Sequence, residues 1–253
     1  MGVLDTFSLE GKIALLTGAA GIAGQQILRS LVEAGATTYI ASRNKSALDI
    51  LAKSYTDRGD SVIALEYDQS DEKSIHRMRD EILERSGTPH VLVNNAVARP
   101  MKQGYHDDLS AFDESMRINA TGLFAITRAI GDTMAKQGRG SIINIGSIQG
   151  MVAPDPSVYR GTDMHGWYPD YFFHKGGMIN FTRFTASYYG AQNVRCNCLS
   201  PGGIQQDTQP AAFIEQYNDR TFLGRLANED DLMGAVVFLA SDASSPSTPL
   251  AQS

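Results

Sequence analysis

The sequence is poor in the side chains that build disulfide frameworks and metal centres. It holds only two cysteines, Cys196 and Cys198, and five histidines among 253 residues. The two cysteines lie only two positions apart in a predicted strand, and we do not expect a disulfide between them. Neither a Cys/His cluster nor an H-E-x-x-H sequence is present, so no metal site is predicted. Both observations favour a reducing, cytoplasmic setting.

Excess positive charge and long apolar runs are also lacking. The net charge is −6 and the isoelectric point is near 5.3, which argues against nucleic acid or an anionic membrane as the main partner. No apolar run is long enough to span a bilayer, and residues 1–7 show no secretory signal. We therefore expect a cytoplasmic protein whose partner is a small molecule.

What the sequence does contain is a glycine-rich turn between a buried strand and a helix. The apolar run Lys12–Thr17 predicts the strand, and Gln25–Ala34 has a helical apolar pattern. Glycines let the backbone approach a pyrophosphate, and a helix N-terminus offers free N–H groups. This context predicts a dinucleotide site, with a plain tight turn as the alternative. Its candidate binding residues are Gly18, Gly21, Ile22 and Gly24.

The next predicted strand, Thr37–Ala41, ends at Ser42 and Arg43. An acidic residue at such a strand end would bind an adenosine ribose diol and repel a 2′-phosphate. A hydroxyl and a guanidinium suit a phosphate instead. The strand end therefore favours NADP over NAD, with a solvated surface arginine as the alternative.

Strand-like and helix-like segments continue to alternate along the chain. Further strands are predicted at 61–67, 90–96, 140–145 and 193–199, and helices at 44–58, 70–86, 110–134, 170–191 and 230–240. This alternation predicts an α/β fold in which residues 1–243 form a single doubly wound Rossmann-fold domain. Its parallel sheet would have six or seven strands flanked by helices. The polar tail 244–253 contains two prolines and is not expected to form a central strand.

Several polar side chains stand out against this framework. Tyr171 and Lys175 are four residues apart in a predicted helix, so they share one face. A nearby ammonium lowers a phenol pKa from about 10, which makes Tyr171 a candidate proton donor and acceptor, although such a pair also arises by chance. Ser147 follows the strand 140–145. Asn119 and Gly122 interrupt an otherwise good helix, and such breaks tend to mark functional or close-packed positions.

Together these motifs resemble the short-chain dehydrogenase/reductase family over nearly the whole chain. Thr17-Gly18 with Gly21 and Gly24 resembles the family's cofactor loop, Asn94-Asn95-Ala96 its N-N-A-G sequence, and Pro201-Gly202 its P-G turn. The resemblance implies further cofactor contacts at Asp68, Gln69, Asn95, Ala96, Tyr171, Lys175, Pro201, Gly202 and Ile204. It also implies a catalytic tetrad of Asn119, Ser147, Tyr171 and Lys175.

The resemblance implies an NAD(P)-dependent oxidoreductase that moves hydride between nicotinamide and a carbonyl or secondary alcohol, for instance on a sugar or polyol. Tyr171 would act as general acid and base, and Lys175 would lower the pKa of Tyr171 and bind the nicotinamide ribose. Ser147 would hydrogen-bond the developing alkoxide, and Asn119 would hold a water in a proton relay.

Three features depart from the family pattern. The glycine spacing T-G-x-x-G-x-x-G is closer to the extended, nucleotide-sugar-modifying branch. Ser147 and Tyr171 are 24 positions apart because of an insertion, Pro154–Pro169, which with the S-P-G-G-I turn resembles a subgroup of bacterial surface-sugar and flagellin-modification dehydrogenases. The family's last strand is not found after Asp242. We expect the tail 244–253 to be disordered or to replace that strand, which leaves a homodimer or a homotetramer open.

Other interpretations stay open at this point. One is a nucleotide-sugar epimerase or dehydratase with tightly bound NAD, and another is a catalytically idle NADP-binding protein. In the insertion, Trp167 would be a packing anchor or a wall of the substrate site. The segment Gln205–Tyr217 is a candidate mobile lid.

Overall fold

Six parallel strands form one sheet in the part of the chain that the computed structural model describes, residues 2–245. Their order across the sheet is β3-β2-β1-β4-β5-β6, the doubly wound Rossmann order. The predicted fold is therefore confirmed, with six strands. They are β1 (Ile13–Thr17), β2 (Thr37–Ser42), β3 (Val62–Glu66), β4 (Val91–Asn94), β5 (Gly140–Ile145) and β6 (Val194–Leu199).

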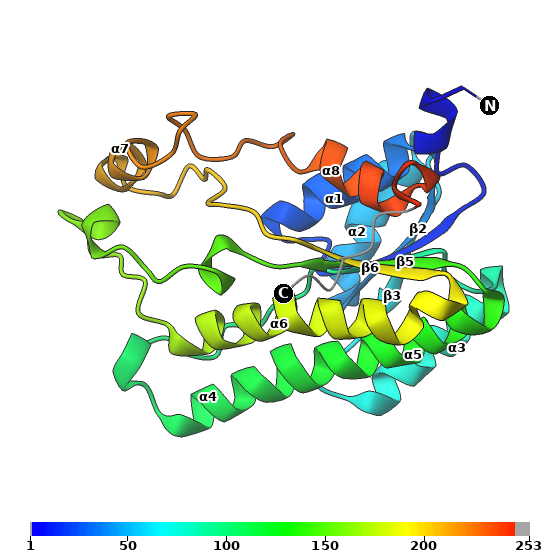
Figure 1. Ribbon diagram of the computed structural model, residues 1–253, viewed down its shortest axis with the longest axis horizontal. Helices are drawn as coiled ribbons and strands as arrows, with labels where there is room; N and C mark the ends of the chain where they lie inside the picture. Colours follow the sequence, from blue (N-terminus) through cyan, green and yellow to red (C-terminus); the bar gives the residue numbers. More distant parts are fainter. Residues whose placement is uncertain (1, 246–253) are drawn as a thin grey trace.

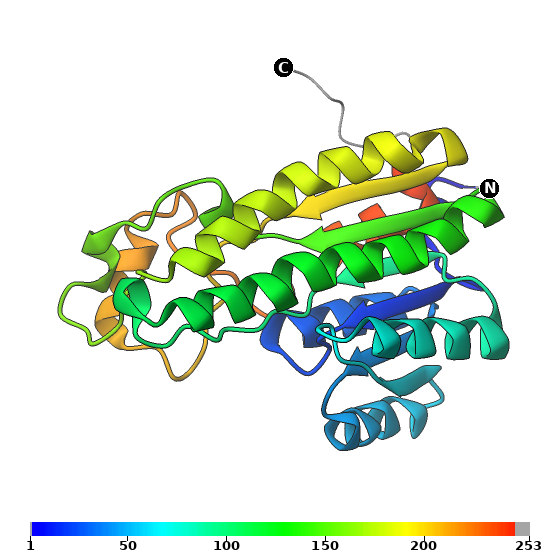
Figure 2. The same cartoon turned by 90° about the horizontal axis from the view of Figure 1, so that it is seen from below.

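Helices cover both faces of this sheet (Figures 1 and 2). The α-helices are α1 (Ile22–Glu33), α2 (Lys45–Thr56), α3 (Glu72–Ser86), α4 (Leu109–Met116), α5 (Leu123–Gln137), α6 (Pro169–Tyr189), α7 (Ala211–Asn218) and α8 (Met233–Ala240). Short 3-10 turns are η1 (Leu4–Phe7), η2 (Gly104–His106), η4 (Ile148–Gly150), η5 (Pro156–Tyr159), η6 (Gly190–Gln192) and η7 (Asp242–Ser244).

The alternation of side chains along each strand divides the core into two halves. In β1, Leu16 packs with residues of α1, α2 and α8, whereas Leu15 packs with residues of α3, α5 and α6, and both leucines are fully buried. A strand buried on both faces requires a nearly continuous apolar run, as Lys12–Thr17 provides. The strands run from the right of Figure 1 to the left, so the loops at their carboxyl ends gather on the left with α7.

Two boundaries differ from the sequence-based prediction. Helix α1 begins at Ile22, so Gly24 lies inside the helix rather than in the turn before it. The helix predicted at 110–134 is two helices joined by a π-helical turn, η3 (Arg117–Gly122), which contains Asn119. A Cβ atom at Gly122 would lie 2.2 Å from the Gln69 carbonyl oxygen, so close packing explains this glycine. From residue 246 onward the predicted tail lies outside the described residues.

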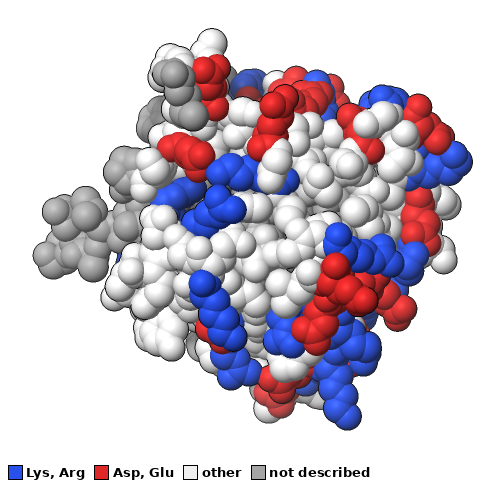
Figure 3. Space-filling model, turned by 90° about the vertical axis from the view of Figure 1, so that its right-hand side faces the viewer, with Lys and Arg blue, Asp and Glu red and all other residues white. Residues whose placement is uncertain are grey.

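The end of the molecule at the amino ends of the strands has a mixed charge. Figure 3 views this end, and basic and acidic side chains lie beside one another on it. One of the ion pairs in this region joins Lys12 to Asp242 at 3.1 Å. Among the described residues, no helix combines the length and apolarity needed to cross a membrane.

Candidate active site

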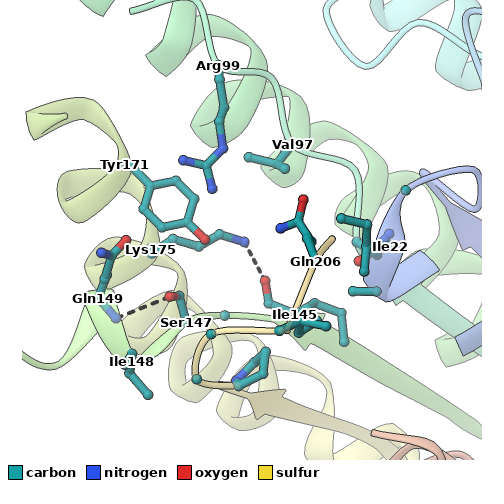
Figure 4. Close-up of a pocket in the computed structure, with 18 of the residues that line it drawn as sticks. Ile22, Val97, Arg99, Ile145, Ser147, Ile148, Gln149, Tyr171, Lys175 and Gln206 are labelled. Carbon is teal, nitrogen blue, oxygen red and sulfur yellow. Dashed lines mark hydrogen bonds between the residues drawn. The ribbon is translucent and has the colours of Figure 1, made fainter. Parts of the chain in front are cut away.

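A cavity of about 670 Å³ lies at the carboxyl edge of the sheet. Its walls come from the β1–α1 turn, the ends of β4, β5 and β6, helix α6 and the segment that carries α7. In an open parallel sheet, ligands bind in such a crevice outside the carboxyl ends of the strands, where the connections diverge to opposite faces. Three of the four predicted catalytic residues line it, namely Ser147, Tyr171 and Lys175 (Figure 4).

Ser147 stands just beyond β5 in an extended conformation, with φ of −167°. Its side chain is 8% exposed, and its Oγ accepts a hydrogen bond from the Gln149 backbone N–H at 3.1 Å. This bond caps the short turn η4 and fixes the hydroxyl oxygen, while the hydroxyl hydrogen remains a donor for a ligand.

Tyr171 and Lys175 lie one turn apart on α6, with the Lys175 Nζ atom 5.8 Å from the centre of the Tyr171 ring. The Nζ atom donates a hydrogen bond to the Ile145 carbonyl oxygen at the end of β5. Burial lowers the pKa of Lys175 to about 8; the nearby Cys198 raises it and the positive charge of Arg99 lowers it further. Figure 4 shows the Tyr171 hydroxyl, the Ser147 hydroxyl and the Lys175 ammonium facing the same space.

Arg99 is a site residue that the sequence reasoning did not single out. Its guanidinium carbon lies 4.0 Å from the centre of the Tyr171 ring, which is a cation–π contact. Arg99 comes from the loop after β4 and lines the cavity from the side opposite Lys175 (Figure 4). No local signal reveals this position, because the contact joins residues 72 positions apart in the chain.

Asn119 is not among the residues that line the cavity, and its side chain is engaged elsewhere. Its amide oxygen accepts from the Ala98 N–H at 2.9 Å, and its amide nitrogen donates to the Ala98 carbonyl at 2.8 Å. The same nitrogen donates to Ser115 Oγ, which donates to the buried Asp170 carboxylate at 2.6 Å. This chain of hydrogen bonds ties the π-helical turn to the loop that carries Arg99 and to the start of α6.

The glycine turn has the geometry that a bound pyrophosphate requires. Gly18 has φ of +70°, and a Cβ atom there would lie 2.9 Å from the Ala96 backbone. A Cβ atom at Gly24 would lie 2.2 Å from the Gly18 carbonyl, so α1 can approach the turn only without a side chain there. Gly21 caps α1 without a side-chain hydrogen bond, and Ile22 follows it at the helix start. The first N–H groups of α1 are thus directed at the cavity, where an anion would be stabilised.

Asn95 and Ala96 support this turn through hydrogen bonds to Thr17 and Gly18. The Asn95 amide nitrogen donates to the carbonyl oxygens of Thr17 and Gly18, at 3.1 and 2.9 Å. The Thr17 hydroxyl accepts from the N–H groups of Asn95 and Ala96. These bonds use the side chain of Asn95 inside the protein, so it positions the turn, while its remaining surface and Ala96 line the cavity.

A second cavity of about 170 Å³ adjoins the first at Gly18, Ala96 and Val97. Four predicted cofactor residues line it, namely Ser42, Arg43, Asp68 and Gln69. Partial burial works to raise the pKa of Asp68, but hydrogen bonds from Ser70 and the charges of Arg43 and Arg117 lower it overall. The Gln69 amide nitrogen donates to the Ile118 carbonyl at 2.9 Å.

The predicted P-G turn closes the other end of the large cavity. The Pro201 carbonyl accepts from the Ile148 N–H at 3.0 Å, which joins this turn to η4 behind Ser147. Gly202 and Ile204 line the cavity, and Ile204 pairs with Ala227 in an isolated bridge. The two cavities together therefore contain every cofactor-binding residue predicted from the sequence.

The insertion Pro154–Pro169 forms the outer wall with α7. Val158 packs with Phe213 and Leu226 in a small apolar cluster, and Arg220 bonds Asp155 at 3.0 Å. An outer cavity of about 490 Å³ lies between these segments, and its lining includes His165 and Tyr168. Trp167 is 50% exposed and is not among the residues that line these three cavities, so both of its predicted roles stay predictions.

Comparison with known proteins agrees with the fold. A model of the family described as Enoyl-(Acyl carrier protein) reductase matches residues 18–248. The chain is 28% identical over 243 residues to 7alpha-hydroxysteroid dehydrogenase of Bacteroides fragilis, which covers 92% of this chain and 88% of the relative. It is 30% identical over 250 residues to gluconate 5-dehydrogenase of Gluconobacter oxydans, which covers 95% and 92%.

Among solved structures, a gluconate 5-dehydrogenase from Burkholderia cenocepacia in complex with NADP and tartrate superposes with a TM-score of 0.87. The identity is 30%, and the match covers 98% of this chain and 94% of the other. The chain belongs to the short-chain dehydrogenase/reductase family. It is an NAD(P)-dependent oxidoreductase that acts on a small molecule, and these relatives do not favour the epimerase alternative. The surface-sugar subgroup stays a prediction.

Proposed function

We propose that this protein is an NADP-preferring dehydrogenase/reductase of polyhydroxylated small molecules, with Tyr171 as general acid and base. The observation that carries the proposal is the meeting of Tyr171, Lys175 and Ser147 in one cavity that continues to the glycine turn. When bound, the nicotinamide cofactor supplies or accepts the hydride. The gluconate-named relatives support a hydroxylated substrate.

Tyr171, Lys175 and Ser147 each have a separate role in the proton transfer. In the reducing direction the Tyr171 phenol donates its proton to the substrate carbonyl oxygen, and Lys175 stabilises the phenolate that remains. Ser147 donates a hydrogen bond to the oxygen as its negative charge develops. The residues expected to hold the cofactor are Gly18, Gly21, Ile22, Gly24 and Asn95 at the turn, Ala96, Pro201, Gly202 and Ile204 beside the nicotinamide, and Ser42, Arg43, Asp68 and Gln69 at the adenosine.

The role of Asn119 follows from its contacts. Because its side chain is bonded to Ala98 and Ser115, it acts as a positioning residue, and a water in the proton relay would be held by the irregular backbone of η3.

Tyr171→Phe tests the catalytic assignment. Removing the hydroxyl should lower kcat by roughly 10²- to 10⁴-fold, while the Kd for NADPH changes by less than about two-fold. Tyr105→Phe is the matched control, because Tyr105 is 72% exposed and lies outside the cavity. Unchanged turnover in Tyr171→Phe would refute Tyr171 as the general acid and base.

The NADP preference is supported by Arg43, which lines the adenosine cavity and has no ion pair within the described residues. Arg43→Leu should raise the KM for NADP by about 10-fold or more and leave the KM for NAD unchanged, since only NADP carries the 2′-phosphate. Arg58→Leu, at an exposed position after α2, is the control. A better KM for NAD than for NADP in the unmodified protein contradicts the proposal.

A homodimer or homotetramer is supported by an aromatic stripe on α5 and α6. Phe181, Phe184 and Tyr188 stack in succession on α6 at centroid distances of 6.3 and 6.1 Å, and Phe124 of α5 contacts Phe181. Phe184 and Tyr188 are 60% and 63% exposed, which is unusual for large aromatic side chains of a monomer. Phe184→Arg should dissociate the oligomer in light scattering. A monomeric unmodified protein at micromolar concentration would exclude this stripe as an interface.

We also propose a cytoplasmic location. Cys196 and Cys198 are free thiols, and Cys196 is fully buried, which suits a reducing compartment. Localisation of a tagged full chain by microscopy tests this, and secretion of the chain would contradict it.

A further inference from the structure

Arg99 holds a positive charge at the mouth of the site without a partner of opposite sign. It is exposed, and within residues 2–245 its side chain makes neither an ion pair nor a hydrogen bond. Its guanidinium stacks on Tyr171, with its central carbon 4.0 Å from the ring centre. Stacking uses one face of the planar guanidinium and leaves its N–H edges free to bind an anion.

The protein fixes the backbone beside this arginine. The adjacent residue, Ala98, exchanges two hydrogen bonds with the amide of Asn119, at 2.9 and 2.8 Å. Asn119 is in turn held by Ser115, whose hydroxyl bonds the buried carboxylate of Asp170. The backbone next to Arg99 is therefore held in place, and the stacking on Tyr171 orients its side chain.

The location of Arg99 separates it from the groups that would bind cofactor phosphates. Those groups are the N-terminus of α1 at the glycine turn and Arg43, which lines the second cavity. Arg99 instead lines both the large cavity and the outer cavity, together with Tyr171. An anion bound by Arg99 would therefore be part of the substrate.

The outer cavity is lined by side chains that suit a hydroxylated molecule. Amides come from Gln149 and Gln206, and phenols from Tyr159 and Tyr168. Figure 4 shows the Gln206 amide directed into the same space as the Arg99 guanidinium. The one acidic side chain in this lining is Asp163, which lies exposed on the insertion.

We propose that the substrate is a polyhydroxylated carboxylate, such as a sugar acid, whose carboxylate pairs with Arg99 while its reacting carbon faces Tyr171. This inference rests on the proposed function and adds the substrate class. A guanidinium fits a carboxylate with two parallel N–H···O bonds, and the stacking on Tyr171 places this ion pair within one small molecule's length of the reacting oxygen. The amides and phenols would bind the substrate hydroxyls.

Matched substrates that differ only in the carboxylate test this proposal. D-gluconate is compared with D-glucitol, and D-galactonate with galactitol, each with NADP. The acid should have a kcat/KM higher than its polyol by roughly 10- to 150-fold, the range expected for hydrogen bonds to a charged group. A higher kcat/KM for the polyols, or for D-glucitol 6-phosphate, overturns the proposal.

Variants of Arg99 separate recognition of the carboxylate from support of Tyr171. Arg99→Met should lower kcat/KM for the acids at least about 10-fold more than for the polyols, and Arg99→Lys should recover part of that difference. Arg160→Met, an exposed arginine on the insertion, is the control. An equal loss for acids and polyols in Arg99→Met would show that the arginine serves only the tyrosine.

Binding provides a readout that is independent of turnover. Calorimetric titration of D-gluconate into the Tyr171→Phe protein saturated with NADPH should give binding that Arg99→Met removes, whereas D-glucitol binds at least 10-fold more weakly. If NADPH binds and D-gluconate does not, the carboxylate proposal fails while the proposed function stands. If NADPH itself does not bind, the proposed function fails first.

Discussion

Replacing Lys175 by methionine should remove catalysis and at the same time stabilise the protein near pH 7. Lys175 is 3% exposed, and burial lowers the pKa of its ammonium from 10.5 to about 8, with Cys198 opposing this shift and Arg99 adding to it. A shift of this size corresponds to about 3 kcal/mol of free energy of unfolding that is lost while the buried group is charged.

The pH dependence has a definite sign. Below about pH 8 the lysine is protonated in both the folded and the unfolded chain, so the full cost is present. Between about pH 8 and 10.5 the unfolded chain binds a proton that the folded protein does not, so rising pH stabilises the folded state. Lys175→Met lacks this contribution, and its stability should not show this rise.

The change in unfolding free energy for Lys175→Met also includes the loss of a hydrogen bond. Methionine cannot replace the bond from Nζ to the Ile145 carbonyl, a loss of about 1 to 2 kcal/mol. The variant should therefore be more stable than the unmodified protein by about 1 to 2 kcal/mol at pH 7, and less stable by a similar amount above about pH 10.

Urea unfolding followed by far-UV circular dichroism, at several pH values and one protein concentration, measures these differences. Lys45→Met is the control, because Lys45 is 48% exposed and its replacement should not change the pH dependence. Curves of stability against pH that run parallel for Lys175→Met and the unmodified protein would refute the reasoning.

Three further predictions concern packing and reactivity. Gly24→Ala should lower the free energy of unfolding by at least about 2 kcal/mol and weaken NADPH binding, because the added Cβ would lie 2.2 Å from the backbone of the glycine turn. Gly234→Ala is the control in the same urea assay. Gly234 has open space around it, so this variant should be neutral or stabilising by up to about 1 kcal/mol. Asp170→Ala should destabilise the protein by about 1.5 to 3 kcal/mol and lower kcat, since a buried hydroxyl loses its carboxylate acceptor; equal stability of variant and parent contradicts this. With a thiol reagent at pH 8, Cys198 should react well before Cys196, whose burial raises the pKa of its thiol; mass spectrometry of the modified peptides decides the order.

Local patterns were sufficient to predict the sheet and the glycine turn, whereas the catalytic set was predicted from the family resemblance. The apolar run before Gly18, the glycines after it and the spacing of Tyr171 and Lys175 are encoded by neighbouring residues, so each predicts its own geometry. The break at Asn119 was also visible, because asparagine and glycine weaken a helix wherever they occur in its interior. The structure adds that this break is a π-helical turn.

Long-range contacts could not be predicted in this way. The stacking of Arg99 on Tyr171 depends on how the loop after β4 meets α6, and no local pattern encodes it. The same holds for Asp170, which looks like an ordinary acid at a helix start but lies buried against Ser115. The exposure of Trp167 was equally hidden, because a large aromatic side chain suggests burial or ligand contact, and this one is half exposed.

The close approach of η4 to α6 has a consequence for the insertion. A Cβ atom at Gly150 would lie 2.7 Å from the Lys175 carbonyl carbon, so the two backbones touch and hold the two ends of the loop 151–168 near each other. The entropy of closing such a loop grows only with the logarithm of its length, by about 0.6 kcal/mol for each doubling. Residues can therefore be added to or removed from this wall at a small thermodynamic cost, while Ser147 and Tyr171 keep their separation in space.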